Sequence, residues 1–521
     1  MNAFQRAWRY ITRKPTKTVL LIITFFLIGN LVILGLGISQ AAENAKVLTR
    51  QQMRAVVSYE TDYNAYWQYI DTLTDEDEIN EAYEHSPRIN KDSALKLTTD
   101  SRVKAFNYMT NTVAYSVEFE NVPLGNEENK GEMYASAEGG EEFVYVEPNL
   151  MLYANMFPNM IELAEGTFTV TDGRFYTQDE IDTAAKVAVI TKELAEQNGF
   201  RVGDTFRITT VDSYTLKQLK DSGMEYNEDD MNLELEIVGI YETKNDVDPN
   251  AQNFQWMSPY ESPKNIILIP MTAYTEYQSE VASIQYSMYA MQNPDFEVDM
   301  DEITAQFDVP SRVVYLLNDP LEVEDFVKDH SEDLDEYTIL NANNETFKKL
   351  SRPLDTMSFF ANIVVWIVVV NAVVIISLVT ALTLKTREYE IGVLLSLGVT
   401  KLKVILQLFI ELILIALLGF TLAVGSGSLL AGRVGDAVLD YQTAADAEYE
   451  TTDEGYYWYD STDYFTEVTQ DDMLSKYEVS VSPALILEIY ILGTAVVLIA
   501  IAIPSIMIMR LNPKQILLEQ N

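Results

Sequence analysis

Four long blocks of apolar residues constrain the fold of this 521-residue chain more than any other feature. They span residues 19–38, 359–384, 404–431 and 484–509. The first two contain no charged side chain, and the third contains only Glu411. Each block reaches the length of about 20 residues with which an α-helix crosses about 30 Å of hydrocarbon. We therefore predict four transmembrane helices, TM1 to TM4, with these bounds.

The first block also has features of a secretory signal peptide, because a basic segment precedes it and small residues such as Ser39 and Ala41 follow it. The apolar core of a signal peptide runs for about 7–15 residues, whereas this block has 20. We therefore interpret it as a retained transmembrane helix.

Net positive charge is confined to three short segments of the chain. Residues 1–18, 385–403 and 510–521 carry 11 Lys and Arg against 3 acidic residues, whereas the whole chain has a net charge of −43, which leaves −51 for the remainder. Short basic loops stay in the cytoplasm, and acidic domains are readily translocated. We therefore expect a multi-pass plasma-membrane protein with cytoplasmic N and C termini and a large domain outside.

The composition excludes several classes of function. The chain has no cysteine and only two histidines, His85 and His330, so thiol chemistry, disulfides and histidine-based zinc sites have almost nothing to use. No GxxxxGK[ST] phosphate loop is present, and the acidity disfavours nucleic acid as a partner. The acidic run 293–302 is interpreted as a solvated face rather than a divalent-ion site. We predict a non-catalytic chain that binds no cofactor itself.

Segments between the blocks predict an α+β domain on helical stalks. Residues 39–57 are rich in helix formers and lack Gly and Pro, so TM1 is expected to continue outward as a stalk. Residues 344–358 are expected to form a second stalk, bent or started near Pro353. Between them, residues 58–343 contain β-rich runs such as NIILIP and RVVYLLN beside short helical patterns. The predicted fold class is membrane α-helical with a large α+β extracytoplasmic domain.

Residues 432–483 are expected to form a smaller external loop. The stretch 432–482 holds 13 acidic residues against Arg433 and Lys476, with a cluster of aromatic residues. It fits an ordered contact module or cap on the main domain as well as it fits a loosely structured acidic loop. Residues 510–521 form the cytoplasmic tail.

At the N terminus, residues 1–18 predict an amphipathic helix lying in the membrane interface. Phe4, Ala7, Trp8 and Ile11 recur at helical spacing, with arginines available to lipid phosphates. Phe4, Trp8 and Ile11 are the expected membrane-contacting residues. A plain basic flank of TM1 is the alternative.

Glu411 is expected to lie inside TM3, where an ionised group is costly and faces a partner or a cavity. One interpretation is a proton or ion relay, and the other is a structural hydrogen bond to a neighbouring helix. The apolar blocks contain no Lys, Arg or His partner for a relay, so we favour the structural role.

The loop between TM2 and TM3 carries the most informative motif. Residues 385–403 read KTREYEIGVLLSLGVTKLK, with charged ends and an apolar middle. Exposed apolar residues in a loop mark a protein contact, although a short helix buried in lipid would have the same pattern. Gly392 and Gly398 allow close approach and a turn.

This segment resembles the TRxxEIGxLxxLG signature of FtsX-like (MacB-type) ABC transporter permeases. It follows an apolar span and precedes QxFxE and LLGFTLAVGSG, as in that family. The run from VAVITKELAEQNGFRVGDTFRI to NIILIP resembles the external core domain of the family, and the N-terminal WRYITRKPTKTVLL resembles Gram-positive members. The fifty-residue link before TM4 and residues 58–135 depart from the family pattern.

The resemblance implies that residues 385–403 form a coupling helix that docks on a separate ATP-binding subunit. The matching positions are Arg387, Glu390, Ile391, Gly392, Leu395 and Gly398. It also implies ATP and Mg on that partner, and a second permease, identical or related, in a type VII transporter. In that class, ATP-driven motion is transmitted to the external domains, with export of, or resistance to, peptides or lipophilic compounds as the expected outcome.

Two other functions remain open at this stage. In the first, the same motion activates an external hydrolase or a sensor kinase, which genetic neighbours would reveal. In the second, the chain is a structural membrane anchor with an adhesive ectodomain and has no ATPase partner.

Overall fold

A computed structural model describes residues 3–84, 87–126, 133–136, 142–251, 253–293, 299–446, 464–465 and 469–510. The chain divides into two compact units. The helical unit comprises residues 1–53, 345–458 and 466–521, and the sheet unit comprises 54–344 and 459–465. Four helices are long and apolar enough to cross a membrane, and the sheet unit mixes strands and helices. The predicted fold class is therefore confirmed.

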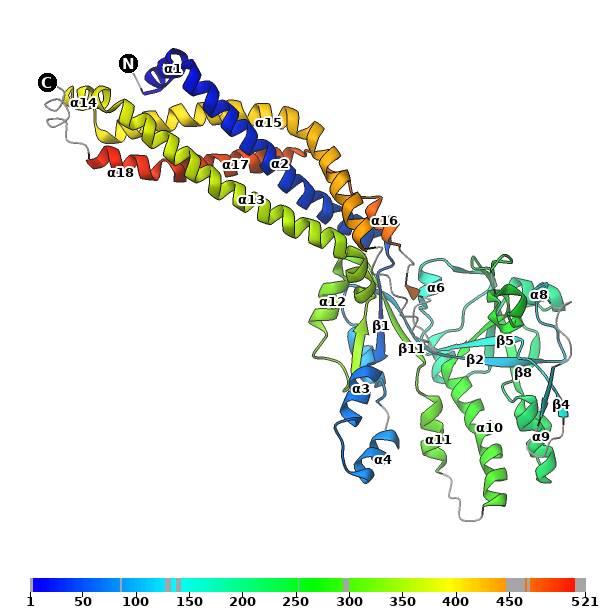
Figure 1. The fold of residues 1–521 in the computed structure, drawn as a ribbon. Coiled ribbons are helices and arrows are strands. Elements are labelled where there is room, and N and C mark those ends of the chain that lie inside the picture. Colours follow the sequence, from blue (N-terminus) through cyan, green and yellow to red (C-terminus); the bar gives the residue numbers. More distant parts are fainter. Residues whose placement is uncertain are drawn as a thin grey trace. The chain divides into compact units, whose positions relative to one another are not determined.

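The helical unit is built from long helices joined by short connections. Its described helices are α1 (Ala3–Arg13), α2 (Pro15–Gln52), α13 (Asn344–Thr386), α14 (Glu388–Ser396), α15 (Lys401–Asp446), α16 (Gln470–Leu474), α17 (Pro483–Ala500) and α18 (Ala502–Arg510) (Figure 1). The predicted TM1, TM2 and TM3 lie in α2, α13 and α15. The fourth block is divided between α17 and α18, and Pro504 lies in the first turn of α18, where its missing N–H removes no intrahelical bond.

The helix ends differ from the expected segment bounds in two places. Helix α2 ends at Gln52 rather than near residue 57, because Val56 and Val57 begin a strand that pairs on both sides. Helix α15 continues to Asp446, so the first part of the segment 432–483 is helical rather than loop. By contrast, α13 contains Pro353 and runs unbroken from Asn344, which makes the second stalk and TM2 one helix.

Close approach of α2 and α15 depends on glycine. A Cβ atom at Gly419 would lie 2.5 Å from the Cβ of Phe25, and one at Gly29 would lie 2.7 Å from the Cβ of Ala423. The Phe25 ring packs edge-on against Phe420, with centroids 5.6 Å apart. Small residues at such crossings let membrane helices pack backbone to backbone.

Polar contacts join α2 to α13 along their length. The hydroxyls of Ser39 and Ser358 are 2.8 Å apart, and Asn362 donates to Ser39 at 3.1 Å. Further along, Lys46 Nζ lies 2.8 Å from Asp355 Oδ1. The two long helices are therefore held side by side within the helical unit.

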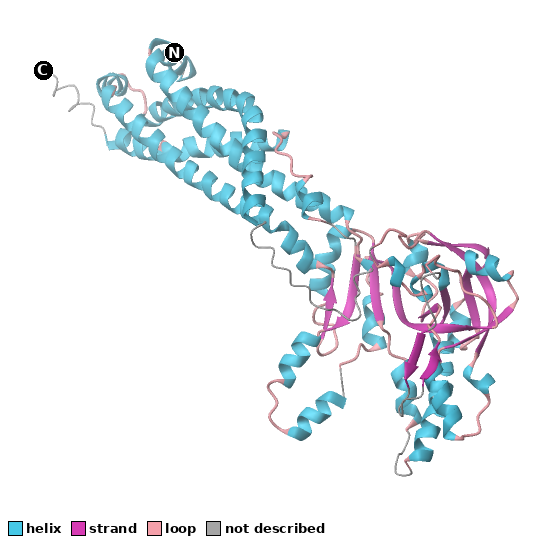
Figure 2. Ribbon diagram, turned by 45° about the vertical axis from the view of Figure 1, so that its right-hand side comes forward, coloured by secondary structure: helices cyan, strands magenta, loops and turns pink. Residues whose placement is uncertain are grey.

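The sheet unit is organised around a mixed sheet (Figure 2). The described strands are β1 (Val56–Thr61), β2 (Val103–Val117), β5 (Leu150–Asn155), β6 (Phe168–Gly173), β7 (Val187–Thr191), β8 (Thr205–Thr209), β9 (Leu233–Thr243), β10 (Ile266–Pro270), β11 (Arg312–Leu317) and β12 (Thr338–Asn341), with β3 (Met133–Ser136) and β4 (Glu142–Tyr145) paired separately. Their order is β12-β1-β11-β2-β5-β10-β7-β9-β6, and β8 bridges β2 and β9. Pairs β5–β10 and β7–β9 are parallel, and the others are antiparallel.

Helices flank this sheet and connect its strands. They are α3 (Tyr63–Ile70), α4 (Glu76–Glu84), α5 (Lys91–Leu97), α6 (Ile161–Ala164), α7 (Gln178–Asp182), α8 (Lys192–Asn198), α9 (Ser213–Ser222), α10 (Met271–Gln292), α11 (Met300–Phe307) and α12 (Val323–Asp329). Strand β7 leads directly into α8, which ends at Gly199 with a φ of 69°. This left-handed conformation is the usual glycine stop of a helix.

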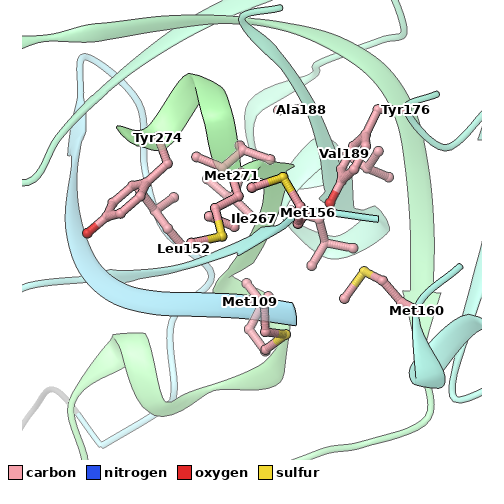
Figure 3. Packing of buried hydrophobic residues seen from close by; sticks show 14 of the residues in the cluster. Met109, Leu152, Met156, Met160, Tyr176, Ala188, Val189, Ile267, Met271 and Tyr274 are labelled. Carbon is pink, nitrogen blue, oxygen red and sulfur yellow. The ribbon is translucent and has the colours of Figure 1, made fainter. Parts of the chain in front are cut away.

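The core of the sheet unit lies where β2, β5, β7 and β10 meet α10. Figure 3 shows Met109, Met156 and Met271 among aliphatic and aromatic side chains, and all three are buried. Strands β7 and β10 are buried on both faces, as expected for uninterrupted runs of Val, Ile and Leu. The burial of these strands accounts for the stability of the unit as a separate compact body.

Candidate functional site: α14 and the helices that hold it

Helix α14 is a nine-residue helix between two much longer ones. Helix α13 ends at Thr386, Arg387 leaves the helical conformation, and α14 begins at Glu388. At the other end, Gly398 has a φ of 87°, and its N–H donates to Leu395 O at 3.1 Å. Glycine adopts this conformation without strain, so Gly398 ends α14 and allows the turn into α15.

Arg387 and Glu411 form a buried ion pair. Arg387 Nη1 lies 2.8 Å from Glu411 Oε2, and the two side chains are 14% and 5% exposed. Gln407 Nε2 donates to the other carboxylate oxygen at 2.9 Å. A carboxylate removed from water needs such partners, because an unpaired buried charge costs several kcal/mol. The pair fixes the start of α14 to the first quarter of α15.

Helix α1 joins the same network. Arg6 Nε donates to Gln407 Oε1 at 2.9 Å, and the Tyr10 ring centroid lies 3.7 Å from the guanidinium carbon of Arg387. Ala7, which follows Arg6 and lies one turn before Tyr10, is fully buried. Figure 1 shows α1 and α14 at the same end of the helical unit. This network therefore ties three segments that are far apart in sequence.

The structure separates the residues expected at the coupling surface into two groups. Ile391 is 4% exposed, Gly392 is buried, and the half-buried Leu395 packs against the core of the helical unit. Glu390 is exposed and lies 3.4 Å from Arg387 Nε. Arg387 itself points inward. Of the six positions, Glu390 and Gly398 are exposed.

The exposed surface of α14 and the turn after it also includes residues outside the expected set. Tyr389 is 51% exposed and Leu397 is 76% exposed. No periodic pattern predicted this exposure, because the helix is apolar on several sides. Tyr389 lies in the first turn of α14, and Leu397 directly follows the helix.

The α1 residues expected in the membrane interface also differ in exposure. Phe4 and Trp8 are 51% and 53% exposed, one turn apart on the same side, whereas Ile11 is partly buried against the helical core. The contact of Phe4 and Trp8 with lipid stays a prediction.

Two further sequence observations concern ionisable groups. His330 lies in the sheet unit, where its ring nitrogens contact Asp100 at 3.0 Å and Asp333 at 3.2 Å. No group of three metal-ligating side chains occurs among the described residues. His85 and residues 294–298 of the acidic run 293–302 lie outside the described residues.

Family models match both units of the chain. Residues 31–308, more than half of its length, match the MacB-like periplasmic core domain, and residues 362–513 match the C-terminal part of FtsX-like permeases. Four membrane-spanning helices that carry such a core domain define an ABC transporter permease. The chain belongs to the FtsX-like permeases with a MacB-like core domain, and is thus a membrane protein with an extracytoplasmic domain.

A similar full-length relative is the uncharacterized ABC transporter permease YclI of Bacillus subtilis (strain 168), with 27% identity over 100% of both chains. Two solved structures show partial similarity at 8% identity. The periplasmic region of MacB from Actinobacillus actinomycetemcomitans gives a TM-score of 0.26 over 57% of this chain and 92% of that one. The extracellular domain of YknZ, a noncanonic ABC-type transporter from Gram-positive bacteria, gives 0.27 over 55% and 99%.

Proposed function

We propose that this chain is a permease subunit that receives motion from a separate ATP-binding subunit at α14 and passes it to the sheet unit outside the membrane. The observation that carries this proposal is the construction of α14. Its exposed side chains, Tyr389 and Leu397, lie on a helix whose opposite side is fixed to α15 by the Arg387–Glu411 pair. In this arrangement α1, α14 and the termini are cytoplasmic.

Rigid connections support the transmission of motion. Helix α15 packs closely on α2 at Gly29 and Gly419, and α2 has 38 residues and α13 has 43. At 1.5 Å per residue, these helices are about 57 and 65 Å long, roughly twice the hydrocarbon thickness. A displacement of α14 would therefore move helices that extend well beyond the bilayer. Four spans per chain favour a dimer with an identical or related permease.

Photo-crosslinking from α14 tests the docking step. A benzoylphenylalanine at Leu397 or at Tyr389 of the full-length chain in its native membrane is expected to crosslink an ATP-binding protein. The same probe at Leu382, which is 66% exposed on the apolar part of α13, serves as the lipid-facing control. Absence of any ATP-binding protein among products from both α14 positions would contradict the proposal and favour a structural anchor.

The orientation of the chain across the membrane can be tested separately, because the chain has no cysteine. A single cysteine in place of Leu397 should react with a membrane-impermeant maleimide only after the cells are opened. One in place of Tyr63, which is 58% exposed on α3, should react on intact cells. The reverse pattern would place α14 outside and rule out the docking proposal.

For the cargo, we propose a cationic peptide. The chain without its three basic segments has a net charge of −51, and an open cleft of about 770 Å³ lies between α10 and α11. Glu276, Glu280, Asp301 and Asp308 line it, and no basic side chain does. Long-range attraction of this kind raises the encounter rate and weakens with salt.

Binding of a fluorescent oligolysine peptide to the purified full-length chain tests this cargo. Affinity should fall at least tenfold between 20 mM and 300 mM salt, with the Debye length shortening from about 20 to about 6 Å. Glu276→Gln with Glu280→Gln should weaken binding, whereas the matched pair Glu324→Gln with Asp325→Asn on α12 should not. If the two pairs of substitutions change the affinity equally, or if the peptide does not bind at either salt concentration, the cleft is not the binding site.

A further inference from the structure

Tyr464 and Phe465 belong to the sheet unit although the described helices on either side of them, α15 and α16, belong to the helical unit. Sequence patterns did not distinguish this tyrosine from the other aromatic residues between TM3 and TM4. The described residues that contact the Tyr464 side chain all belong to the sheet unit.

The Tyr464 ring fills an apolar pocket. It is 4% exposed and packs in one cluster with side chains from β1, β2, α6 and β11, and Phe465 packs against the edge of that cluster. The cluster consists of Val56, Ala105, Ile161, Val314, Leu316 and Tyr464. The pocket thus lies among β1, β2, β11 and α6 of the sheet unit.

Buried polar groups at the end of the pocket match the tyrosine hydroxyl. Tyr464 Oη donates to Glu162 Oε1 at 2.7 Å and accepts from Asn107 Nδ2 at 2.9 Å. Asn107 also donates to Glu162 and accepts from the Ile161 N–H at 3.0 Å. Burial and the nearby Glu162 carboxylate raise the pKa of Tyr464 well above its usual value, so the hydroxyl keeps its proton and remains a donor.

Two arginines contact Tyr464: one binds its backbone carbonyl, and both lie near its ring. Arg54 Nη1 donates to Tyr464 O at 2.8 Å, and its Nε donates to Glu165 at 3.2 Å. The guanidinium carbons of Arg54 and Arg312 lie 5.6 and 5.8 Å from the ring centroid, within the range of cation–π attraction. Arg54 comes two residues after the end of α2 and two before β1.

We propose that this pocket is a tyrosine-binding site whose ligand is Tyr464 of the same chain, and that it holds Tyr464 and Phe465 to the start of β1. The chain then returns to the sheet unit at these two residues, in addition to the junctions at residues 53–54 and 344–345. Only the mechanical consequence of this attachment rests on the proposed function, because the binding site itself does not depend on an ATPase.

The polar end of the pocket argues against simple filling of an apolar gap. A phenylalanine would occupy nearly the same volume but would remove one hydrogen-bond donor from the buried Glu162 carboxylate and one acceptor from the Asn107 amide. Sites built to hydrogen-bond a hydroxyl discriminate strongly against ligands that lack it. The pocket therefore selects tyrosine rather than any large apolar side chain.

Photo-crosslinking at Phe465 in the full-length chain tests the site directly. A benzoylphenylalanine at this position should crosslink to α6 or to the residues around Arg54, as identified by proteolysis and mass spectrometry. Adding Tyr464→Ala should lower the yield at least tenfold, and Tyr464→Phe should lower it several-fold. Tyr63→Ala, which removes an exposed tyrosine of α3, should leave it unchanged.

Products confined to lipid or to the helical unit, or a yield unaffected by Tyr464→Ala, would overturn the proposal. Because Tyr464→Ala could impair folding, Glu162→Gln provides a second variant. It keeps the shape of the side chain and weakens the hydrogen bond from the Tyr464 hydroxyl. This variant should lower the crosslinking yield several-fold in a chain of unchanged melting temperature. Crosslinks from Leu397 to an ATP-binding protein report only on the proposed function. Failure of either proposal is therefore visible independently of the other.

Discussion

In the helical unit, α2 and α15 meet at glycines, whereas in the sheet unit β2, β5 and β10 meet through Leu, Met and Tyr side chains. The difference follows from the solvent. In water, burial of apolar area stabilises a core, but between membrane helices lipid tails are as apolar as leucine, so close backbone packing and polar contacts decide the arrangement. In the helical unit, specificity is therefore concentrated at a few positions, and in the sheet unit it is distributed over many.

The largest effect is expected from breaking the ion pair of the helical unit on one side. Glu411→Ala leaves Arg387 buried without its carboxylate and should destabilise the chain by about 3–5 kcal/mol. The double variant Arg387→Met with Glu411→Leu removes both charges and should recover most of this loss. Thermal unfolding of the full-length chain in lipid nanodiscs measures both.

A double variant as unstable as Glu411→Ala would show that the pair contributes through the hydrogen bond from Gln407, which itself accepts from Arg6, rather than through charge balance. The comparison between the units would then rest on helix packing alone.

The next largest effect concerns the glycine contact. Gly419→Val places methyl groups where a Cβ atom would already lie 2.5 Å from Phe25 and 3.1 Å from the carbonyl of Ile22. Overpacking of this kind costs about 2–3 kcal/mol. Gly425→Val is the matched control on the same helix, because a Cβ atom there meets nothing within 4 Å. Equal losses of melting temperature would mean that helix propensity, not contact, explains the result.

In the sheet unit, a comparable single change should cost less and should depend on pH. Asp100 lies 2.6 Å from Arg102 and 3.0 Å from His330, and the Arg102 hydrogen bond holds the pKa of Asp100 well below its usual value. A depressed pKa stabilises the folded state above the unfolded pKa of about 3.9, and this contribution disappears as the pH falls toward the folded pKa. Asp100→Asn should therefore cost about 1.5–2 kcal/mol at pH 7.

Calorimetric unfolding of the wild type and of Asp100→Asn between pH 7 and pH 3 measures that difference. It should stay constant down to about pH 4 and shrink below it. A difference that grows on acidification would contradict the assigned direction of the shift.

The smallest effect on stability is expected on the outward side of α14. Leu397→Ser removes an apolar side chain that is 76% exposed and should change the free energy of unfolding by less than about 0.5 kcal/mol. Copurification with the ATP-binding subunit should nevertheless fall at least tenfold. Loss of both stability and copurification would indicate that Leu397 is part of the fold rather than of the docking surface.

Much of the fold could be predicted because its signals are local. The apolar blocks reveal the membrane spans, and continuous Val, Ile and Leu runs reveal β7 and β10. Helix α10, with 22 residues, was missed because its buried residues follow no amphipathic stripe. The end of α2 at Gln52 was also missed, because β1 is defined by its partners β11 and β12 rather than by its own sequence.

The candidate site was predictable in position but not in orientation. The motif located α14. It also suggested that Arg387 and Ile391 lie on the outward surface of this helix, whereas both side chains point inward in the structure. The partner of Glu411 lies 24 residues earlier and outside the apolar blocks, so a search within the blocks could not find it. Tyr464 depends on contacts with residues more than 300 positions away, which no local pattern encodes.

The Arg387–Glu411 pair also sets an order for biosynthesis. At about 5–20 residues per second, the ribosome adds Glu411 roughly 1–5 s after Arg387, and long after Arg6 has been released on the N-terminal helix. Arg6 and Arg387 therefore both precede Glu411 in the nascent chain. Arg387 is available to pair with Glu411 as the third span inserts, which would lower the cost of carrying an acidic residue into the bilayer.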